Sequence, residues 1–435
     1  MATEPLAATG RNPIHRIPPS RVPIQVLEIE LFPSDGSRPS VRHPVATGRA
    51  VAAGPTLALV RARGRPLGLI QADARDPGEL TALLTATAER LSDEGAGRAE
   101  ADAALPIDPP LVSVVIATRE RPGMLEKCLT AVRGLDYPRF EVIVVDNAPV
   151  TEDTAAMVTT RFPDVRYLRE PRKGLARAHN RALPEARGEI IAFTDDDVVV
   201  DRHWLRAVAG GFAAAERVGC VTGLIVPAEL ATRAQAMLER HGGFAKGFER
   251  RVLSLEEPGD DPLFPFAAGT FGSGANMAFD AALLRRMGGF DPAMGAGTPA
   301  RGGDDLLAFF RIITAGRRLV YEPRAITWHH HRRSEADLAT QVFGYGVGLG
   351  AFLTAAVTAE PRMLPRLIRR VPQGVGHALR RAAAHRTPEA DRDRRDTAAT
   401  WPWKLSLMEW YGMLNGPLSY ARSRRTARRT GGTTL

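Results

Sequence analysis

An alternation of apolar runs and amphipathic segments from Leu111 to Phe212 restricts the fold of this chain more than any other feature. The run "LVSVVIAT" is apolar at nearly every position, which is typical of a strand buried on both faces. Pro122 follows near a predicted helix start, and the helix carries apolar residues at helical spacing: Leu125, Cys128, Leu129 and Val132. Strands "FEVIVVDN", "VRYLRE" and "EIIAFT" then alternate with further helical segments. This order predicts an α/β fold in which a mainly parallel sheet carries helices on both faces.

Three segments of different character divide the chain. Residues 1–105 contain short β-like runs, one helical pattern and a Gly/Glu/Ala-rich stretch, which predicts a small N-terminal α+β accessory domain with a disordered start and a linker. Residues 106–335 hold the alternating pattern, with further strands expected at "GCVTGLIV", "GANMAF" and "RRLVYEP". Residues 336–435 are predicted to form a helical, basic C-terminal region.

The positive charge of the chain is concentrated at its C-terminal end. Of 58 Lys and Arg and 49 Asp and Glu (net +9), residues 361–435 contain 16 and 5, a surplus of 11 that leaves about −2 for the rest. A basic end on a near-neutral body indicates contact with an anionic membrane surface, and no nucleic acid is expected. The longest uncharged run, Val342 to Val357, has sixteen residues, fewer than the ~20 that span a bilayer. A buried helix is therefore favoured over a membrane-surface helix, and a true span is the third choice.

The compartment predicted from the sequence is a reducing one. The two cysteines, Cys128 and Cys220, lie in separate apolar runs and suggest neither a disulfide framework nor a zinc site. The first residues show no apolar segment of the kind found in a signal peptide. We expect a cytoplasmic protein with peripheral contact at the inner face of the membrane.

Polar side chains gather where the predicted strands end. In an open α/β sheet, ligands bind outside the carboxyl ends of the strands. The residues at these positions are Thr118 to Glu120, Asp146 and Asn147, Asp195 to Asp197, and His329 to His331, while Asp304 and Asp305 begin a helix. The sequence has neither the G-x-G-x-x-G nor the Walker-A loop, so a diphosphate would instead be neutralised by Mg²⁺ or Mn²⁺, which takes one or two protein carboxylates. In an extended strand Asp195 and Asp197 face one side together, and so do His329 and His331.

Each of these clusters also has an interpretation without a ligand. The three aspartates could form a solvated turn, Asp304 and Asp305 could cap a helix, and Asp146 could belong to an Asx turn. The segment "FGSGANMAF" could be a glycine-loosened hairpin. Because four such clusters share one predicted sheet edge, we favour a ligand site.

The motifs resemble those of family 2 glycosyltransferases. The matching segments are, in order, "VSVVIATRERPGMLEKCLTAV", "FEVIVVDNAP", "GLARAHNRAL", "IIAFTDDDVVVDRHWL", "GANMAF", "GGFDP", "GGDDLLAFFRI" and "YEPRAITWHHHRR". They cover about half of the chain, from Leu111 to Arg333. The resemblance implies the GT-A fold and an inverting transfer of a sugar from a nucleotide-diphosphate donor, with UDP favoured and Mg²⁺ or Mn²⁺ as cofactor.

The resemblance also implies roles for individual residues. The predicted nucleotide contacts are Thr118, Glu120, Asp146, Arg177, Asp195 and Asp196; the predicted metal ligands are Asp197, Asp195 and His329; and the predicted sugar contacts are Gly274, Asn276 and His331. Asp305 matches the catalytic base, with Asp304 beside it, where relatives have Glu. Which aspartate of the triplet is the direct ligand stays open, as does the choice between His329 and His331. Glu120 and Leu307 depart from the family pattern, where an uncharged residue and an acid are common.

The acceptor is not readable from the sequence: a saccharide, a lipid-linked intermediate, a metabolite and a peptide are all compatible with it. Two other functions remain as alternatives. One is a sugar-phosphate nucleotidyltransferase, for which the loop "ATRERPGM" has the charge but few glycines. The other is a catalytically inactive sugar-nucleotide-binding module docked to a membrane surface.

Overall fold

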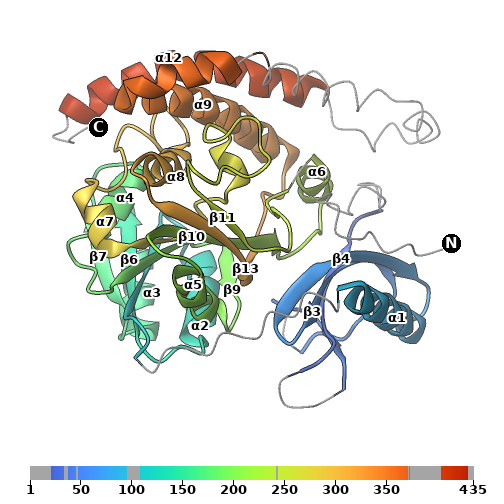
Figure 1. Ribbon diagram of the computed structural model, residues 1–435. Coiled ribbons are helices and arrows are strands. Elements are labelled where there is room, and N and C mark those ends of the chain that lie inside the picture. The colour runs from blue at the N-terminus through green and yellow to red at the C-terminus, as the bar shows by residue number, and fades with distance from the viewer. Residues whose placement is uncertain are drawn as a thin grey trace.

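A nine-stranded sheet forms the centre of the computed structural model, which describes residues 21–33, 38–45, 48–95, 108–241, 243–370, 372 and 403–429 (Figure 1). The strand order is β11-β13-β10-β12-β8-β5-β6-β7, and β9 pairs with β13. The strands are β5 (Val112–Thr118), β6 (Phe140–Asn147), β7 (Arg166–Glu170), β8 (Ile190–Asp195), β9 (Val198–Val200), β10 (Val218–Pro227), β11 (Arg251–Leu253), β12 (Asn276–Asp280) and β13 (Arg318–His329). The predicted N-terminal start, the linker around residue 105 and the last six residues lie outside the described residues.

The direction of the strands confirms a mainly parallel arrangement, in which β9, β11 and β12 run antiparallel to their neighbours. Strands β7, β6, β5 and β8 are parallel neighbours, and β10 is parallel to β13. Between these groups, β12 runs antiparallel to both β8 and β10. Since an antiparallel connection leaves and returns at the same edge of a sheet, the segment between β10 and β12 begins and ends at the carboxyl edge. This return brings Gly274 to the edge where the parallel strands end.

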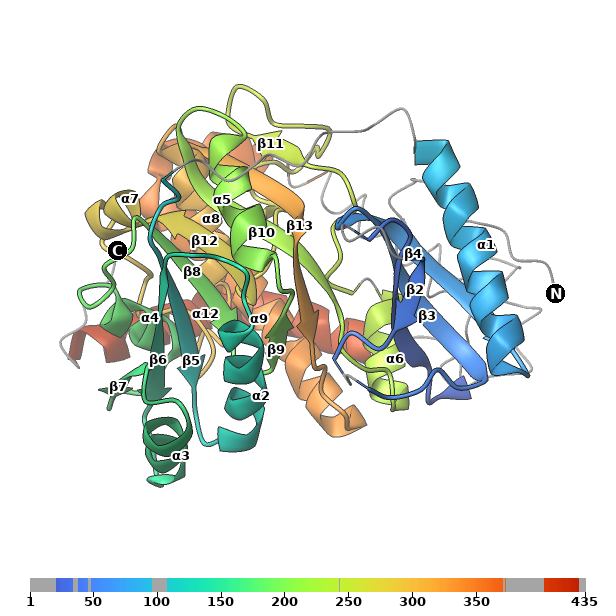
Figure 2. The same cartoon turned by 90° about the horizontal axis from the view of Figure 1, so that it is seen from below.

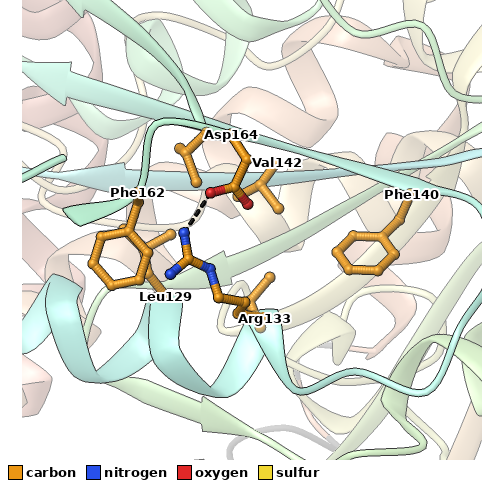
Figure 3. A pocket seen from close by; sticks show the side chains of 8 residues that line it. Leu129, Arg133, Phe140, Val142, Phe162 and Asp164 are labelled. Carbon is orange, nitrogen blue, oxygen red and sulfur yellow. Dashed lines mark hydrogen bonds and ion pairs between the residues drawn. The ribbon is translucent and has the colours of Figure 1, made fainter. Parts of the chain in front are cut away.

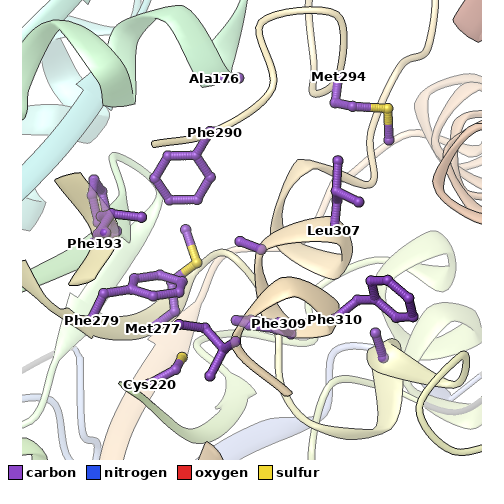
Figure 4. Packing of buried hydrophobic residues seen from close by; sticks show 14 of the residues in the cluster. Ala176, Phe193, Cys220, Met277, Phe279, Phe290, Met294, Leu307, Phe309 and Phe310 are labelled. Atoms are coloured by element: carbon purple, nitrogen blue, oxygen red, sulfur yellow. The ribbon is translucent and has the colours of Figure 1, made fainter. Parts of the chain in front are cut away.

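Helices cover both faces of the sheet, as predicted. Alternate residues of β5 explain this: Val114 and Ile116 belong to the core on one face, and Val115 and Ala117 to the core on the other. The first core packs against α2 (Pro122–Arg133), α3 (Asp153–Arg161) and α5 (Trp204–Ala213). The second packs against α4 (Leu175–Ala182), α7 (Ala281–Arg286), α8 (Asp304–Thr314) and α9 (Glu335–Ala359), and it is rich in phenylalanine (Figure 4).

A separate four-stranded sheet precedes the central one and lies beside it (Figure 2). Its order is β2-β1-β3-β4, formed by β2 (Ser40–Arg42), β1 (Gln25–Glu30), β3 (Gly54–Ala62) and β4 (Arg65–Ala74), and α1 (Pro77–Gly95) packs on it. Its other face shares an apolar core with β10 and β13, where Val26 and Leu57 join Val226 and Trp328. At this boundary the buried Arg61 guanidinium donates to Glu28 and, at 2.7 Å, to Asp201, which directly follows β9.

Two long helices pack along each other at the C-terminal end. They are α9 and α12 (Trp403–Arg429). Other described helical elements are the short α6 (Arg233–His241), two 3-10 turns (Ala268–Thr270 and Pro361–Met363) and a helical stretch at 364–370. Glycines permit the close approach: a Cβ at Gly346 would lie 2.0 Å from the Glu409 carbonyl oxygen, and one at Gly350 2.1 Å from that of Met413. Among the described residues, α9 alone is long and apolar enough to cross a membrane, judged by length and composition only, and half of its apolar window is buried.

Candidate active site

The three aspartates lie in a tight turn between β8 and β9. Asp195 ends β8, and Asp196 and Asp197 form the turn. Because β9 pairs with the end of β13, with Val198 opposite His329, the turn is held beside the histidines. Ligand atoms of Asp195, Asp197 and His329 all lie within 4.8 Å of one another, and His329 Nε2 is 3.3 Å from Asp197 Oδ1. Two carboxylates and an imidazole at this spacing fit Mg²⁺ or Mn²⁺.

Asp196 makes different contacts from its two neighbours. Its Oδ2 accepts a hydrogen bond from the Thr118 hydroxyl at 2.7 Å and one from Arg121 Nε at 3.1 Å. Arg121 also pairs through Nη1 with Asp197 Oδ2 at 2.9 Å, so one guanidinium bridges two aspartates. Arg121 is the residue just before α2, which fixes its backbone at the sheet edge.

The pKa values of the triplet reflect burial and mutual repulsion. Burial, with the charge of Asp197 second, raises the pKa of Asp195 to about 7. Burial likewise raises the pKa of Asp196 to about 6, although Arg121 opposes the shift. Burial would also raise the pKa of Asp197, but His329 and Arg121 together hold it well below its usual range. Arg121 and His329 thus offset only part of the electrostatic cost of burying three aspartates, which favours a further cation there.

Two neighbouring strand ends carry Thr118 and Asp146, both predicted to contact the nucleotide. Thr118 is paired in register with Asp146, which is fully buried. Asp146 Oδ2 accepts a hydrogen bond from the Tyr167 hydroxyl at 2.7 Å, and within the described part of the chain its Oδ1 has no hydrogen-bond partner. Burial raises the pKa of Asp146. An unsatisfied buried carboxylate oxygen is costly unless a ligand completes it.

Glu120 and Arg177, two other predicted nucleotide contacts, lie in the loop after β5 and on α4. Glu120 accepts backbone N–H bonds from Val150 (2.9 Å) and Thr151 (3.3 Å), which lower its pKa and tie the loop after β6 to the end of β5. Arg177 lies on α4 and is 7% exposed; burial, followed by the charge of Arg172, lowers its pKa.

The predicted base lies at the start of α8. Asp305 accepts backbone N–H bonds at 2.8 Å from Gly274 and from Leu306, and burial raises its pKa. Burial and the charge of Asp305 raise the pKa of Asp304 to about 8. The charge of Asp195 adds to this shift, so the aspartate triplet and the acidic start of α8 interact electrostatically. The Asp304 Oδ2 atom lies 4.0 Å from Nδ1 of His179, whose pKa falls to about 3 through burial and which is therefore neutral.

Of the three predicted sugar contacts, His331 and Asn276 are buried behind the aspartate–histidine cluster. His331 Nδ1 is 3.1 Å from His329 Nδ1, and His331 Nε2 is 2.6 Å from Glu239 Oε1 on α6, so His331 links His329 to a buried carboxylate. Asn276 is 1% exposed, and its amide bonds the Leu224 and Ala325 carbonyls and the Trp204 indole. Asn276 thus joins strands within the sheet, whereas Gly274 lies next to Asp305.

Sequence reasoning missed several residues whose side chains contact the predicted ones, among them Arg121, Tyr167 and Glu239. Arg121 could have been predicted from the sequence, because it is a basic residue three positions after Thr118 in the loop that follows the first strand. No sequence pattern indicated Tyr167 or Glu239. Tyr167 is 21 residues from Asp146 along the chain and Glu239 is 92 residues from His331, and only the fold brings each pair together.

A pocket of about 220 Å³ lies apart from this cluster, between α2 and the beginning of β6 (Figure 3). Its lining includes Leu129, Phe140 and Phe162, together with an ion pair between Arg133 and Asp164. None of the predicted site residues lines it, and Phe140 opens β6 at the edge opposite Asp146. This pocket is therefore not the predicted ligand site.

Comparisons with known proteins agree with the motifs. Residues 113–279 match the family model described as glycosyl transferase family 2, which confirms the expected resemblance over this region. Pre-mycofactocin glycosyltransferase of Mycobacterium tuberculosis is 29% identical over 237 residues, which are 54% of this chain and 46% of that protein. Glycosyltransferase AglE of Haloferax volcanii is 34% identical over 101 residues, covering 22% of this chain and 33% of that protein.

Among solved structures, mannosyltransferase PcManGT from Pyrobaculum calidifontis, in complex with GDP-Man and Mn²⁺, aligns with 77% of this chain and 92% of its own. The identity is 22% and the TM-score 0.47. The alignment to the Mycobacterium tuberculosis relatives spans about half of their length, 46%.

Proposed function

We propose that this chain, whose residues 113–279 match glycosyl transferase family 2, is a metal-dependent inverting glycosyltransferase of the GT-A type. It would move a sugar from a nucleotide-diphosphate donor, with a UDP-sugar favoured, to an acceptor that is still to be identified. The observation that carries this proposal is the convergence of Asp195, Asp197 and His329 within 4.8 Å, in electrostatic contact with the acidic start of α8.

The aspartate–histidine cluster would hold the cation. We assign Asp197, Asp195 and His329 as protein ligands of Mg²⁺ or Mn²⁺. When bound, the ion would stabilise the negative charge that develops on the departing nucleoside diphosphate. The link from His329 through His331 to Glu239 would orient the ring of His329, as partners behind a metal ligand commonly do.

The nucleotide would occupy the ends of β5, β6 and β8. The free oxygen of Asp146 is available to a base, and Thr118, Asp195 and Asp196 lie at the adjacent strand ends. Glu120 would act by holding the loop after β6, and Arg177 would contribute positive charge near the donor.

Asp304 and Asp305, the acidic pair at the start of α8, would be in different protonation states and have different roles. Asp304 is more deeply buried and lies beside a neutral His179, so it keeps its proton at neutral pH. Asp305 is half-buried, and the N–H groups of Gly274 and Leu306 stabilise its anion. Asp305 would therefore remove the proton from the acceptor nucleophile, and a single displacement on the opposite face inverts the anomeric carbon.

The acceptor classes for testing are a saccharide, a lipid-linked intermediate, a metabolite and a peptide. Pre-mycofactocin, which the Mycobacterium tuberculosis relatives carry in their name, belongs in the test set. We further propose a cytoplasmic location with peripheral contact between the basic C-terminal region and the anionic inner face of the membrane.

A donor panel tests the proposal. The full chain is incubated with UDP- and GDP-sugars in the presence of Mn²⁺, Mg²⁺ or EDTA, and release of the nucleoside diphosphate is measured. Metal-dependent release from one donor supports a transferase, and NMR of a transferred sugar reports inversion. Full activity after exhaustive chelation contradicts the metal assignment. Pyrophosphate released from a nucleoside triphosphate and a sugar phosphate would instead indicate a nucleotidyltransferase, and binding without turnover would indicate an inactive binding module.

A further inference from the structure

The outward face of α12 exposes an unusual amount of apolar surface. Of the eleven large apolar side chains that are exposed among the described residues, six belong to this helix. They are Trp403 (67% exposed), Leu407 (56%), Trp410 (42%), Tyr411 (63%), Leu414 (76%) and Leu418 (52%). Their spacing of three and four residues places them in one stripe.

The opposite face of α12 is already occupied by the rest of the protein. Its buried residues include Gly412, Gly416 and Tyr420, and the two glycines lie against the backbone of α9. Tyr420 donates a hydrogen bond to Asp291 at 2.9 Å. The helix is therefore fixed in orientation, and the stripe points away from the protein, with α12 lying outermost over α9 (Figure 1). A contiguous exposed apolar stripe of this kind marks an interaction surface.

The stripe continues into positive charge. After Leu418 the same outward face presents Arg422, Arg425 and Arg429, all exposed. Large apolar side chains with two tryptophans and a tyrosine, followed by arginines, match the interface of an anionic bilayer: the rings and leucines enter the headgroup region and the guanidinium groups meet lipid phosphates.

We infer that this outward face of α12 is a docking surface for an anionic lipid bilayer, on which the helix lies parallel to the membrane. This inference rests on the peripheral membrane contact proposed above and names the surface that makes it. The surface lies one helix layer from the catalytic region, because a Cβ at Gly303, the residue before Asp304, would lie 2.6 Å from the Gly348 carbonyl oxygen of α9. Docking there fits a membrane-borne acceptor.

Vesicle co-sedimentation of the full chain tests the inference. Vesicles of phosphatidylcholine alone are compared with vesicles of equal parts phosphatidylcholine and phosphatidylglycerol. We expect binding only to the anionic vesicles, a blue shift of tryptophan fluorescence on binding, and release at high salt, since the Debye length falls from about 10 Å at 0.1 M to about 3 Å at 1 M. No binding to anionic vesicles would overturn the inference.

Variants that introduce or reverse charge on the outward face of α12 test whether this face binds the vesicles. Leu414→Glu with Leu418→Glu should lower partitioning at least about tenfold, because two side chains that would be buried in lipid become charged. Arg425→Glu with Arg429→Glu should remove the preference for phosphatidylglycerol. The matched control is Phe32→Glu, which changes a 50% exposed side chain of the N-terminal sheet region and should bind as the unmodified chain does. Unchanged binding of both α12 variants contradicts the inference.

A second copy of the chain is the other occupant that the experiment can detect. Concentration-dependent dimerisation that Leu414→Glu abolishes, without vesicle binding, would assign the stripe to self-association and overturn membrane docking. Metal-dependent donor hydrolysis without vesicles, measured on the same variants, tests the transferase separately: loss of vesicle binding with hydrolysis retained leaves the proposed function intact.

Discussion

Arg121→Gln tests whether the Arg121 guanidinium neutralises the aspartate triplet in the absence of a metal ion. In the structure Arg121 bonds Asp196 Oδ2 at 3.1 Å and Asp197 Oδ2 at 2.9 Å. The two carboxylates are 0% and 9% exposed, whereas the Arg121 side chain is 34% exposed. Removing one partner of a fully buried ion pair costs about 3–5 kcal/mol. Because Arg121 is one-third exposed, solvent screening reduces this, and we expect a loss of about 2 kcal/mol of unfolding free energy at pH 8.

The pH dependence of this loss has a definite sign. The folded pKa of Asp196, about 6, lies above its unfolded value near 3.9, so this group destabilises the fold increasingly as the pH rises between the two values. Without Arg121 the pKa of Asp196 in the folded protein should rise further, so the loss of folding stability should continue to grow up to a higher pH. The part of the difference that comes from Asp196 should therefore appear above about pH 6 and fade towards pH 5, where Asp196 is mostly protonated. The part that comes from Asp197 should persist at pH 5, because Asp197 is still ionised there.

The assay is urea unfolding followed by circular dichroism, in EDTA and in saturating Mn²⁺. Added Mn²⁺ should supply the missing positive charge, so it should stabilise Arg121→Gln more than the unmodified chain. Arg133→Gln is the matched control, since Arg133 pairs with Asp164 at an exposed site (49% and 61%), where an ion pair contributes at most about 1 kcal/mol. A loss at pH 8 no larger than that of the control, or an equal response to Mn²⁺, would refute the reasoning.

Three further predictions concern the base, the metal and the helix pair. Asp305→Asn should reduce transfer by about 10²–10⁴-fold while donor binding, measured by calorimetry, stays within error; near-normal turnover would remove Asp305 from the base role. The apparent affinity for Mn²⁺, measured by titration at several pH values, should fall at least about tenfold per unit below pH 7, since the metal must displace a proton from Asp195, whose pKa is about 7, and one from His329, whose pKa the charge of Asp197 raises against the effect of burial. A constant affinity between pH 5 and 8 would contradict this. Gly350→Ala should lower the thermal unfolding midpoint, at a cost of about 1–3 kcal/mol, because its Cβ would lie 2.1 Å from the Met413 carbonyl oxygen. The control Gly210→Ala has open space around its Cβ and should be neutral or slightly stabilising.

The sequence was most informative where a pattern has one physical explanation. A strand apolar at nearly every position must be buried on both faces, and β5 is. Alternation along an extended strand predicts that Asp195 and Asp197 face one side, but the strand ends at Asp195 and the next two aspartates form a turn. This turn, held beside β13 by β9, brings the ligand atoms of Asp195 and Asp197 near His329.

The sequence was least informative where a contact depends on three-dimensional return of the chain. The antiparallel direction of β12 cannot be read from "GANMAF", because an apolar run carries no direction. The same reversal places Asn276 inside the sheet, where its amide bonds the Ala325 carbonyl. Likewise, Glu239 reaches His331 only because α6 packs under the end of β13.

The buried pairing of Arg61 with Asp201 has a consequence for how the chain can be divided. A fragment that began at residue 106 would keep every predicted site residue, yet Asp201, 9% exposed in the whole protein, would lose its cation. The same cut would open Trp328, the neighbour of His329 on β13, to water. The family match ends at residue 279, whereas the proposed base Asp305 and the proposed ligand His329 lie beyond it. We therefore expect the smallest stable piece that contains the whole proposed site to include the N-terminal sheet as well.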